Sequence, residues 1–76
     1  MITIYSRPGC MYCEQTKTLL EQRGIEYNEL MLGVDITVEQ LKQLVPGAKS
    51  VPQIMDDSIY VGGYKELIEH LDKNGE

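Results

Sequence analysis

The chain has few residues of several kinds, and two of these shortages exclude a class of site. Its 76 residues include only two cysteines and one histidine, and neither tryptophan nor phenylalanine. Two thiols and one distant imidazole are too few for an intramolecular zinc site, which takes four ligands. No stretch approaches the ~20 consecutive apolar residues of a membrane-spanning helix. We therefore expect no bound metal and no membrane partner.

Basic residues are also scarce. Seven Lys and Arg stand against twelve Asp and Glu, so the formal net charge is −5. The basic residues are scattered singly along the sequence, with no cluster that could follow a phosphate backbone, and nucleic acid is therefore not an expected partner. Residues 1–5 do not resemble a secretory signal, so the cytoplasm, a reducing compartment, is the expected location.

The pattern of apolar residues predicts one α/β domain over residues 1–76. Strands are expected at residues 2–6, 25–32, 51–55 and 59–61, and helices from Cys10 to Gly24, after Thr37, and from Tyr64 onward. The order is βαβ, a helix, then ββα. A right-handed crossover makes the first two strands parallel, and the hairpin adds an antiparallel pair. We therefore predict a four-stranded mixed sheet with helices on both faces, in a monomer.

Cys10 and Cys13 are separated by two residues at the predicted start of the first helix. The free N–H groups and partial positive charge of a helix N-terminus lower the pKa of a thiol, and the thiolate is the nucleophile of disulfide exchange. Helical spacing places Cys13 on the packed face and leaves Cys10 at the exposed tip. A disulfide across so short a loop stabilises little. The pair therefore predicts thiol–disulfide exchange, with Cys10 as nucleophile and Cys13 as resolving thiol.

Three motifs stand in the order and at the spacing of one known family. They are Arg-Pro-Gly-Cys-Met-Tyr-Cys at residues 7–13, Ser-Val-Pro-Gln-Ile at residues 50–54, and Gly-Gly-Tyr at residues 62–64. Together they resemble the signatures of the glutaredoxins, and the resemblance covers essentially the whole chain. It implies a thioredoxin-like fold, glutathione as co-substrate, and protein disulfides or glutathionylated proteins as substrates. Residues 37–64 look most like bacterial and phage glutaredoxins that reduce ribonucleotide reductase, which is an expected candidate substrate.

The resemblance also implies a role for each motif. The Val51-Pro52 bond is expected to be cis, so that the Val51 backbone faces Cys10 and pairs with an extended thiol peptide. Gly63 leads into a helix whose free N–H groups suit the γ-glutamyl carboxylate of glutathione. Arg7 is the expected cation for the glycyl carboxylate, with Lys49 a weaker candidate. The other residues expected to bind glutathione are Tyr12, Ser50, Tyr64, Lys65 and Glu66.

Three departures from the family pattern leave alternatives open. Met11 stands where many relatives have Pro, Ser50 replaces the usual Thr, and the Lys65-Glu66 pair stands where relatives commonly have Asp. One alternative is a donor that is reduced by thioredoxin reductase and ignores glutathione. The other is a module that shares a 2Fe–2S cluster between two chains. The single histidine, His70, is expected to be a solvated helix residue rather than a ligand or base.

Overall fold

The strands build one mixed sheet. The computed structural model describes residues 1–73. Its strands are β1 (Ile2–Ser6), β2 (Tyr27–Met31), β3 (Gln53–Asp56) and β4 (Ile59–Gly62), and its helices are α1 (Met11–Gln22), α2 (Val38–Leu44) and α3 (Tyr64–Lys73). The strand order is β2-β1-β3-β4, with β1 parallel to β2 and antiparallel to β3, and β3 antiparallel to β4. The predicted element order and mixed sheet are therefore confirmed.

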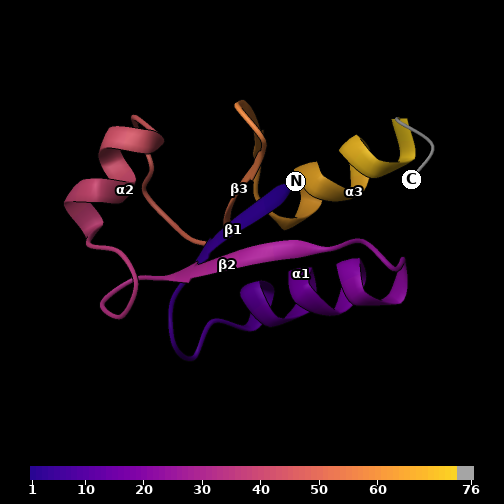
Figure 1. Ribbon diagram of the computed structural model, residues 1–76, viewed down its shortest axis with the longest axis horizontal. Helices are drawn as coiled ribbons and strands as arrows, with labels where there is room; N and C mark the ends of the chain where they lie inside the picture. Colours follow the sequence, from indigo (N-terminus) through magenta and orange to yellow (C-terminus); the bar gives the residue numbers. More distant parts are fainter. Residues whose placement is uncertain (74–76) are drawn as a thin grey trace.

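Helices cover both faces of the sheet, as the sequence predicted. Alternate residues of a strand point to opposite faces, and Ile4 of β1 is fully buried on one face while Tyr5 is buried on the other. Helices α1 and α3 pack on the first face, where the core comprises Ile2, Ile4, Leu20, Ile54, Leu67 and Leu71. Helix α2 lies apart from these two (Figure 1) and packs on the second face, where the core comprises Tyr5, Ile36, Leu41 and Val45. No helix within residues 1–73 is long and apolar enough to cross a bilayer.

Two strands begin later than the sequence predicted. Strand β2 begins at Tyr27 rather than at residue 25, because Ile25 closes the end of α1 by donating its N–H to the Leu20 carbonyl at 2.9 Å. Gly24 permits this closure with a φ of +67°, a value that glycine adopts readily. Strand β3 begins at Gln53 rather than at residue 51. Pro52 has no N–H to contribute to the ladder.

Helix α2 begins directly after Thr37, as predicted, and buries only part of its apolar side chains. The Thr37 hydroxyl accepts the Gln40 N–H at 3.1 Å, and the Gln40 side chain accepts the Thr37 N–H at 2.8 Å. Leu41 is buried, but the other apolar residues of this helix, Val38 and Leu44, are each 53% exposed. A helix of only seven residues has room for few inward-facing side chains, and Leu41 is the buried residue of α2.

His70 lies on helix α3 as predicted, but it is not the fully solvated residue that was expected. Its imidazole Nε2 lies 3.0 Å from the Asp56 carboxylate, and its side chain is only 21% exposed. The pairing joins α3 to the end of β3. It could not be predicted from the sequence because the two residues are brought together only by the antiparallel hairpin and the helix that follows it.

Candidate active site around Cys10

Cys10 is the residue that caps the start of α1. Its backbone is extended, and its sulfur accepts the Cys13 N–H at 3.1 Å. The turn before it contains Gly9, with a φ of +73° that a residue with a side chain rarely adopts. The sulfur therefore stands at the positive end of the helix dipole, in contact with one of the N–H groups that a helix leaves unpaired. This surrounding favours a thiolate when the cysteine is reduced.

The two cysteines differ in exposure and are joined as a disulfide. Cys13 is only 1% exposed, whereas Cys10 is partly exposed at the helix start. This asymmetry agrees with the prediction from helical spacing. A thiol or disulfide in solution can approach Cys10 but not Cys13, so the attacking and resolving positions differ physically.

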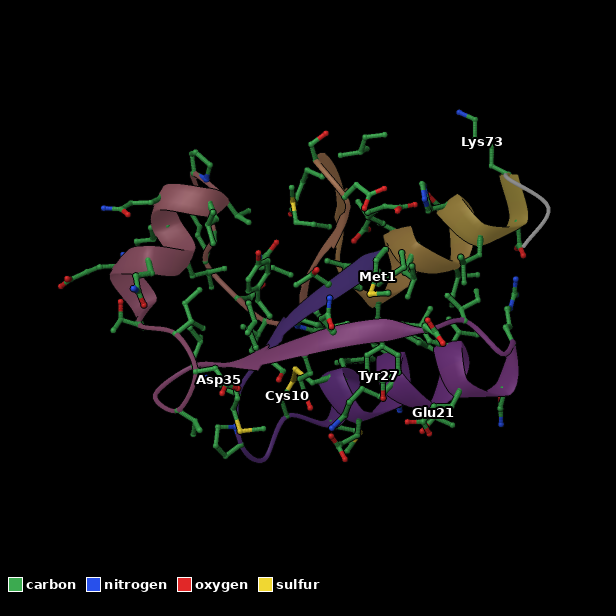
Figure 2. The ribbon with its side chains drawn as sticks, in the orientation of Figure 1. Met1, Cys10, Glu21, Tyr27, Asp35 and Lys73 are labelled. Atoms are coloured by element: carbon green, nitrogen blue, oxygen red, sulfur yellow. A yellow bond between two sulfur atoms is a disulfide. The ribbon has the colours of Figure 1, made fainter. Side chains whose placement is uncertain are left out.

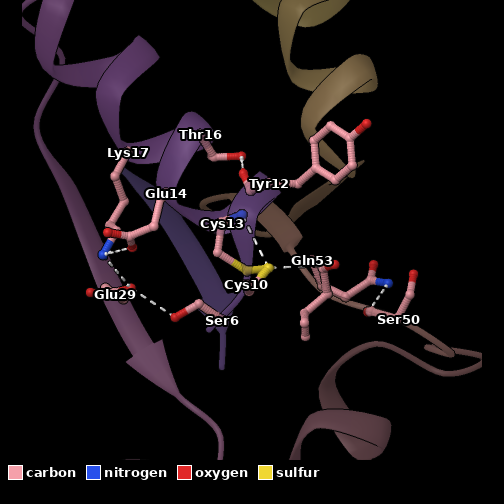
Figure 3. The surroundings of a disulfide bond; sticks show 11 residues. Ser6, Cys10, Tyr12, Cys13, Glu14, Thr16, Lys17, Glu29, Ser50 and Gln53 are labelled. Carbon is pink, nitrogen blue, oxygen red and sulfur yellow. Dashed lines mark hydrogen bonds and ion pairs between the residues drawn. A yellow bond between two sulfur atoms is a disulfide. The ribbon is translucent and has the colours of Figure 1, made fainter. Parts of the chain in front are cut away.

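An ionic network lies beside the disulfide (Figure 3). Lys17 of α1 pairs with Glu14 and, at 3.1 Å, with Glu29 of β2. The hydrogen bond to Glu14 is the largest cause that raises the pKa of Lys17. The fully buried Ser6 donates its hydroxyl to Glu29 at 2.7 Å. These contacts tie the first turns of α1 to β1 and β2, and so hold the cysteine pair against the sheet.

The Val51-Pro52 segment faces the cysteine pair from the other side. The peptide bond between these residues is cis, as the resemblance implied. The Cys10 sulfur lies 3.9 Å from the Val51 carbonyl oxygen. The backbone of Val51 is therefore next to the partly exposed sulfur of the pair.

Most of the predicted site residues line one hollow of about 290 Å³ next to this segment. The rings of Tyr12 and Tyr64 lie 6.0 Å apart at an angle of 36° and connect α1 to α3 across it. We call it the Tyr12 hollow; it is lined by Tyr12, Ser50, Val51, Pro52, Gly63, Tyr64, Lys65 and Glu66. Folding thus brings residues from three separate motifs to one place.

The start of α3 differs from the expectation in one respect. The Gly63 N–H, expected to be free for a ligand, donates to the carboxylate of Glu66 at 2.8 Å. Glu66 therefore caps its own helix, and the N–H groups of Tyr64 and Lys65 remain the nearest candidates for a carboxylate. Glu66 therefore both holds the Gly63 N–H and lines the Tyr12 hollow.

Arg7 lies outside the Tyr12 hollow. It lines a neighbouring hollow of about 410 Å³ together with Lys42 and Lys49, and the two hollows share Ser50 and Val51. We call this second space the Arg7 hollow; the rest of its lining is Leu32, Val38, Leu41 and Ala48. The sequence pattern missed Lys42 and found no basic cluster. The three cations come from a loop, from α2 and from the segment after α2, and only the fold gathers them.

Sequence comparison decides the family. The glutaredoxin family model matches residues 2–61, which is most of the chain. The chain belongs to the glutaredoxin family. Glutaredoxin 1 of Rickettsia felis is 36% identical over 77 residues, which cover 97% of this chain and 74% of that protein. A hybrid peroxiredoxin of Haemophilus influenzae is 35% identical over 70 residues, which cover 92% of this chain, and the chain spans only 29% of that longer protein.

Solved glutaredoxins have the same fold. Reduced glutaredoxin of Escherichia coli superimposes with a TM-score of 0.82 at 30% identity, covering 96% of this chain and 94% of that one. A buckwheat glutaredoxin, solved as a glutathione complex, superimposes with a TM-score of 0.79 at 24% identity, covering 97% of this chain and 69% of that one. The predicted thioredoxin-like fold is therefore confirmed. Glutaredoxins are thiol–disulfide oxidoreductases, and Cys10 and Cys13 are the redox pair of this member.

Among residues 1–73, no three His, Cys, Asp or Glu side chains lie close enough together to hold a metal ion. The Cys10 sulfur lies next to Val51, which lines one hollow with two tyrosines and another with three cations.

Proposed function

We propose that this glutaredoxin reduces glutathione mixed disulfides and protein disulfides with electrons from glutathione. The observation that carries the proposal is the position of the Cys10 sulfur 3.9 Å from the carbonyl oxygen of Val51, a residue that lines both the Tyr12 hollow and the Arg7 hollow. Glutathione is a short extended thiol peptide with a carboxylate at each end. A thiol at Cys10 would place one carboxylate at the start of α3 and the other among the three cations. The glutathione complex of the buckwheat protein supports the same ligand here.

For a glutathionylated substrate, the reduced Cys10 thiolate attacks the glutathione sulfur. A Cys10–glutathione disulfide forms, and the substrate thiolate leaves and takes a proton from water. A second glutathione thiolate then attacks the glutathione sulfur of this adduct. Glutathione disulfide forms and Cys10 returns as thiolate, so each turnover consumes one free glutathione, and the glutathione taken from the substrate becomes the other half of the glutathione disulfide. Tyr12 and Tyr64 would enclose the γ-glutamyl end during both steps.

For a protein disulfide, Cys10 attacks one sulfur and the second substrate sulfur leaves as thiolate. Cys13 then attacks Cys10, releases the other substrate thiolate, and gives the Cys10–Cys13 disulfide that the structure contains. Two glutathione molecules reopen it, first at the exposed Cys10. The burial of Cys13 directs attack from solvent to Cys10. We propose ribonucleotide reductase as one such protein substrate, from the resemblance of residues 37–64, and a monomer as the active form.

Steady-state kinetics coupled to glutathione reductase test the proposal. Wild type and Cys13→Ser should both reduce a small glutathione mixed disulfide, because this cycle needs Cys10 alone, and Cys10→Ser should be inactive. Cys13→Ser should lose most of its activity on a protein disulfide. If folded wild type is inactive with glutathione but is reduced by thioredoxin reductase, the proposal fails in favour of a thioredoxin-like donor. A brown protein after anaerobic reconstitution, without reductase activity, would instead indicate a cluster-binding module.

A further inference from the structure

Gln53 connects the segment beside Cys10 to the edge of the sheet. Its amide Nε2 donates to the Ser50 carbonyl at 2.7 Å, and its Oε1 accepts the Tyr60 hydroxyl at 2.6 Å. The side chain of Gln53 is buried, with 7% exposed, while Tyr60 on β4 is 54% exposed. Figure 3 shows the Gln53 amide reaching across to Ser50. The glutamine thus spans from a solvent-facing strand to the loop that faces the disulfide.

The two partners fix the orientation of the amide. Ser50 offers a carbonyl oxygen, which can only accept, so the amide nitrogen must face it. The oxygen then faces Tyr60, whose hydroxyl can donate. A reversed amide would set two acceptor oxygens against each other at Ser50. The chain of hydrogen bonds therefore runs in one direction, from Tyr60 through Gln53 to Ser50.

The Ser50 carbonyl belongs to the same peptide group as the Val51 N–H. Because a peptide group is planar and trans here, holding the carbonyl direction also holds the N–H, which points the opposite way. A hydrogen bond to the carbonyl polarises the group and makes its N–H a stronger donor. Val51 lines both hollows, and its carbonyl is the backbone oxygen nearest to the Cys10 sulfur in the contacts described above.

We infer that Gln53 is a positioning residue for the reaction at Cys10. It aims and polarises the peptide group between Ser50 and Val51, so that the Val51 N–H is ready to pair with the backbone of an incoming disulfide. The inference rests on the proposed function for its kinetic consequences. Gln53 touches neither the sulfur nor the substrate, and it acts only through this peptide group.

Gln53→Glu separates the two hydrogen bonds. The introduced carboxylate still accepts the Tyr60 hydroxyl, but it sets an oxygen against the Ser50 carbonyl. We expect KM for a glutathione mixed disulfide to rise about three- to tenfold at pH ~8, with kcat changed much less, which is the size of effect that loss of one hydrogen bond produces. Burial raises the pKa of a carboxyl. Its neutral form can donate to Ser50, so the KM ratio to wild type should fall toward one as the pH is lowered to about 5.

Two further variants separate the outer hydrogen bond from the inner one and control for the change in charge. Tyr60→Phe removes only the outer bond at an exposed position and should raise KM about twofold, because the bond to Ser50 remains. Gln43→Glu makes the same charge change on the exposed side of α2, away from both hollows, and should match wild type at every pH.

A measurement on the ligand-free protein separates this inference from the proposed function. The Val51 amide resonance should shift in Gln53→Glu at neutral pH and return toward the wild-type position at low pH, whether or not glutathione is the reductant. An unchanged KM together with an unchanged Val51 resonance would overturn the inference. So would a raised KM that does not recover at low pH while the Val51 resonance stays in place, because that result means a general loss of packing. Inactive wild type with a moving Val51 resonance would overturn the proposed function alone.

Discussion

Gly62, at the end of β4, is a position where a single methyl group should cost the protein much of its stability. Its φ is +123°, in the region that residues with side chains rarely adopt. A Cβ built there would lie 2.9 Å from both Cβ and Cγ of Glu66. The Glu66 Cβ is held by helix α3, so it cannot move away as the end of a long side chain could. Gly62→Ala therefore meets a backbone penalty and a steric one.

The expected size of the effect follows from these two terms. A non-glycine residue in a rare backbone region costs about 1–3 kcal/mol, and the contact with α3 adds to that, so we expect a loss of about 2–4 kcal/mol. A 76-residue domain has a free energy of unfolding of roughly 4–11 kcal/mol. The variant should therefore lose a large share of its stability, with a fall in Tm of about 10 °C or more.

Urea unfolding followed by circular dichroism measures the difference, and the neighbouring glycine supplies the control. A Cβ on Gly63 would lie 3.2 Å from the Glu66 carboxylate oxygen, a mobile atom, and 3.7 Å from the Pro52 carbonyl. Gly63→Ala should therefore cost less than about 1 kcal/mol, the typical effect of a change without strain. Equal stabilities for the two variants, or a Gly62→Ala protein within about 0.5 kcal/mol of wild type, would refute the reasoning.

Three other predictions concern separate parts of the molecule. Lys42→Gln should raise KM for glutathione about two- to fivefold, with a smaller difference at high salt because exposed charges are screened; equal ratios at low and high salt would contradict an electrostatic role. The hydrogen bond to Glu21 (Figure 2) raises the pKa of Tyr27 from 10.0 to about 12. The stability that this hydrogen bond adds is complete below pH 10 and is lost as the pH rises through about 12. In urea unfolding over this pH range, the free energy of unfolding should therefore fall more steeply for wild type than for Tyr27→Phe. Leu67→Ala, at a fully buried position, should lower the free energy of unfolding by about 2–5 kcal/mol in the same assay, and a loss below about 1 kcal/mol would contradict its place in the core.

Local patterns predicted the elements well. Strand β1 occupies residues 2–6 as expected, because an apolar β-rich run ends at a proline-glycine turn. Residues 37–40 alone predicted the capping box of Thr37 and Gln40. The errors at Ile25 and Val51 arose at the ends of strands, where a helix closure or a proline takes the backbone out of the ladder.

The sequence predicted only those parts of the site that belong to its three motifs. The Cys10 and Cys13 asymmetry follows from helical spacing, and the resemblance named the residues that line the Tyr12 hollow. The position of Lys42 in the Arg7 hollow and the hydrogen bonds of Gln53 to Ser50 and Tyr60 were not predicted. Each depends on how distant segments meet in the fold, and no short sequence pattern indicates it. The capping of Gly63 by Glu66 was also missed, although a glutamate three residues after a helix start is a known capping position.

The proposed mechanism depends on Cys10 as the nucleophile and on glutathione as its partner. Mass spectrometry of reduced Cys13→Ser after brief exposure to glutathione disulfide, with peptide mapping, tests it most directly. We expect one glutathione per chain, attached to Cys10, and removed again by added glutathione. A folded protein that takes up no glutathione, or a Cys10→Ser variant that is modified at Cys13 equally fast, would contradict it.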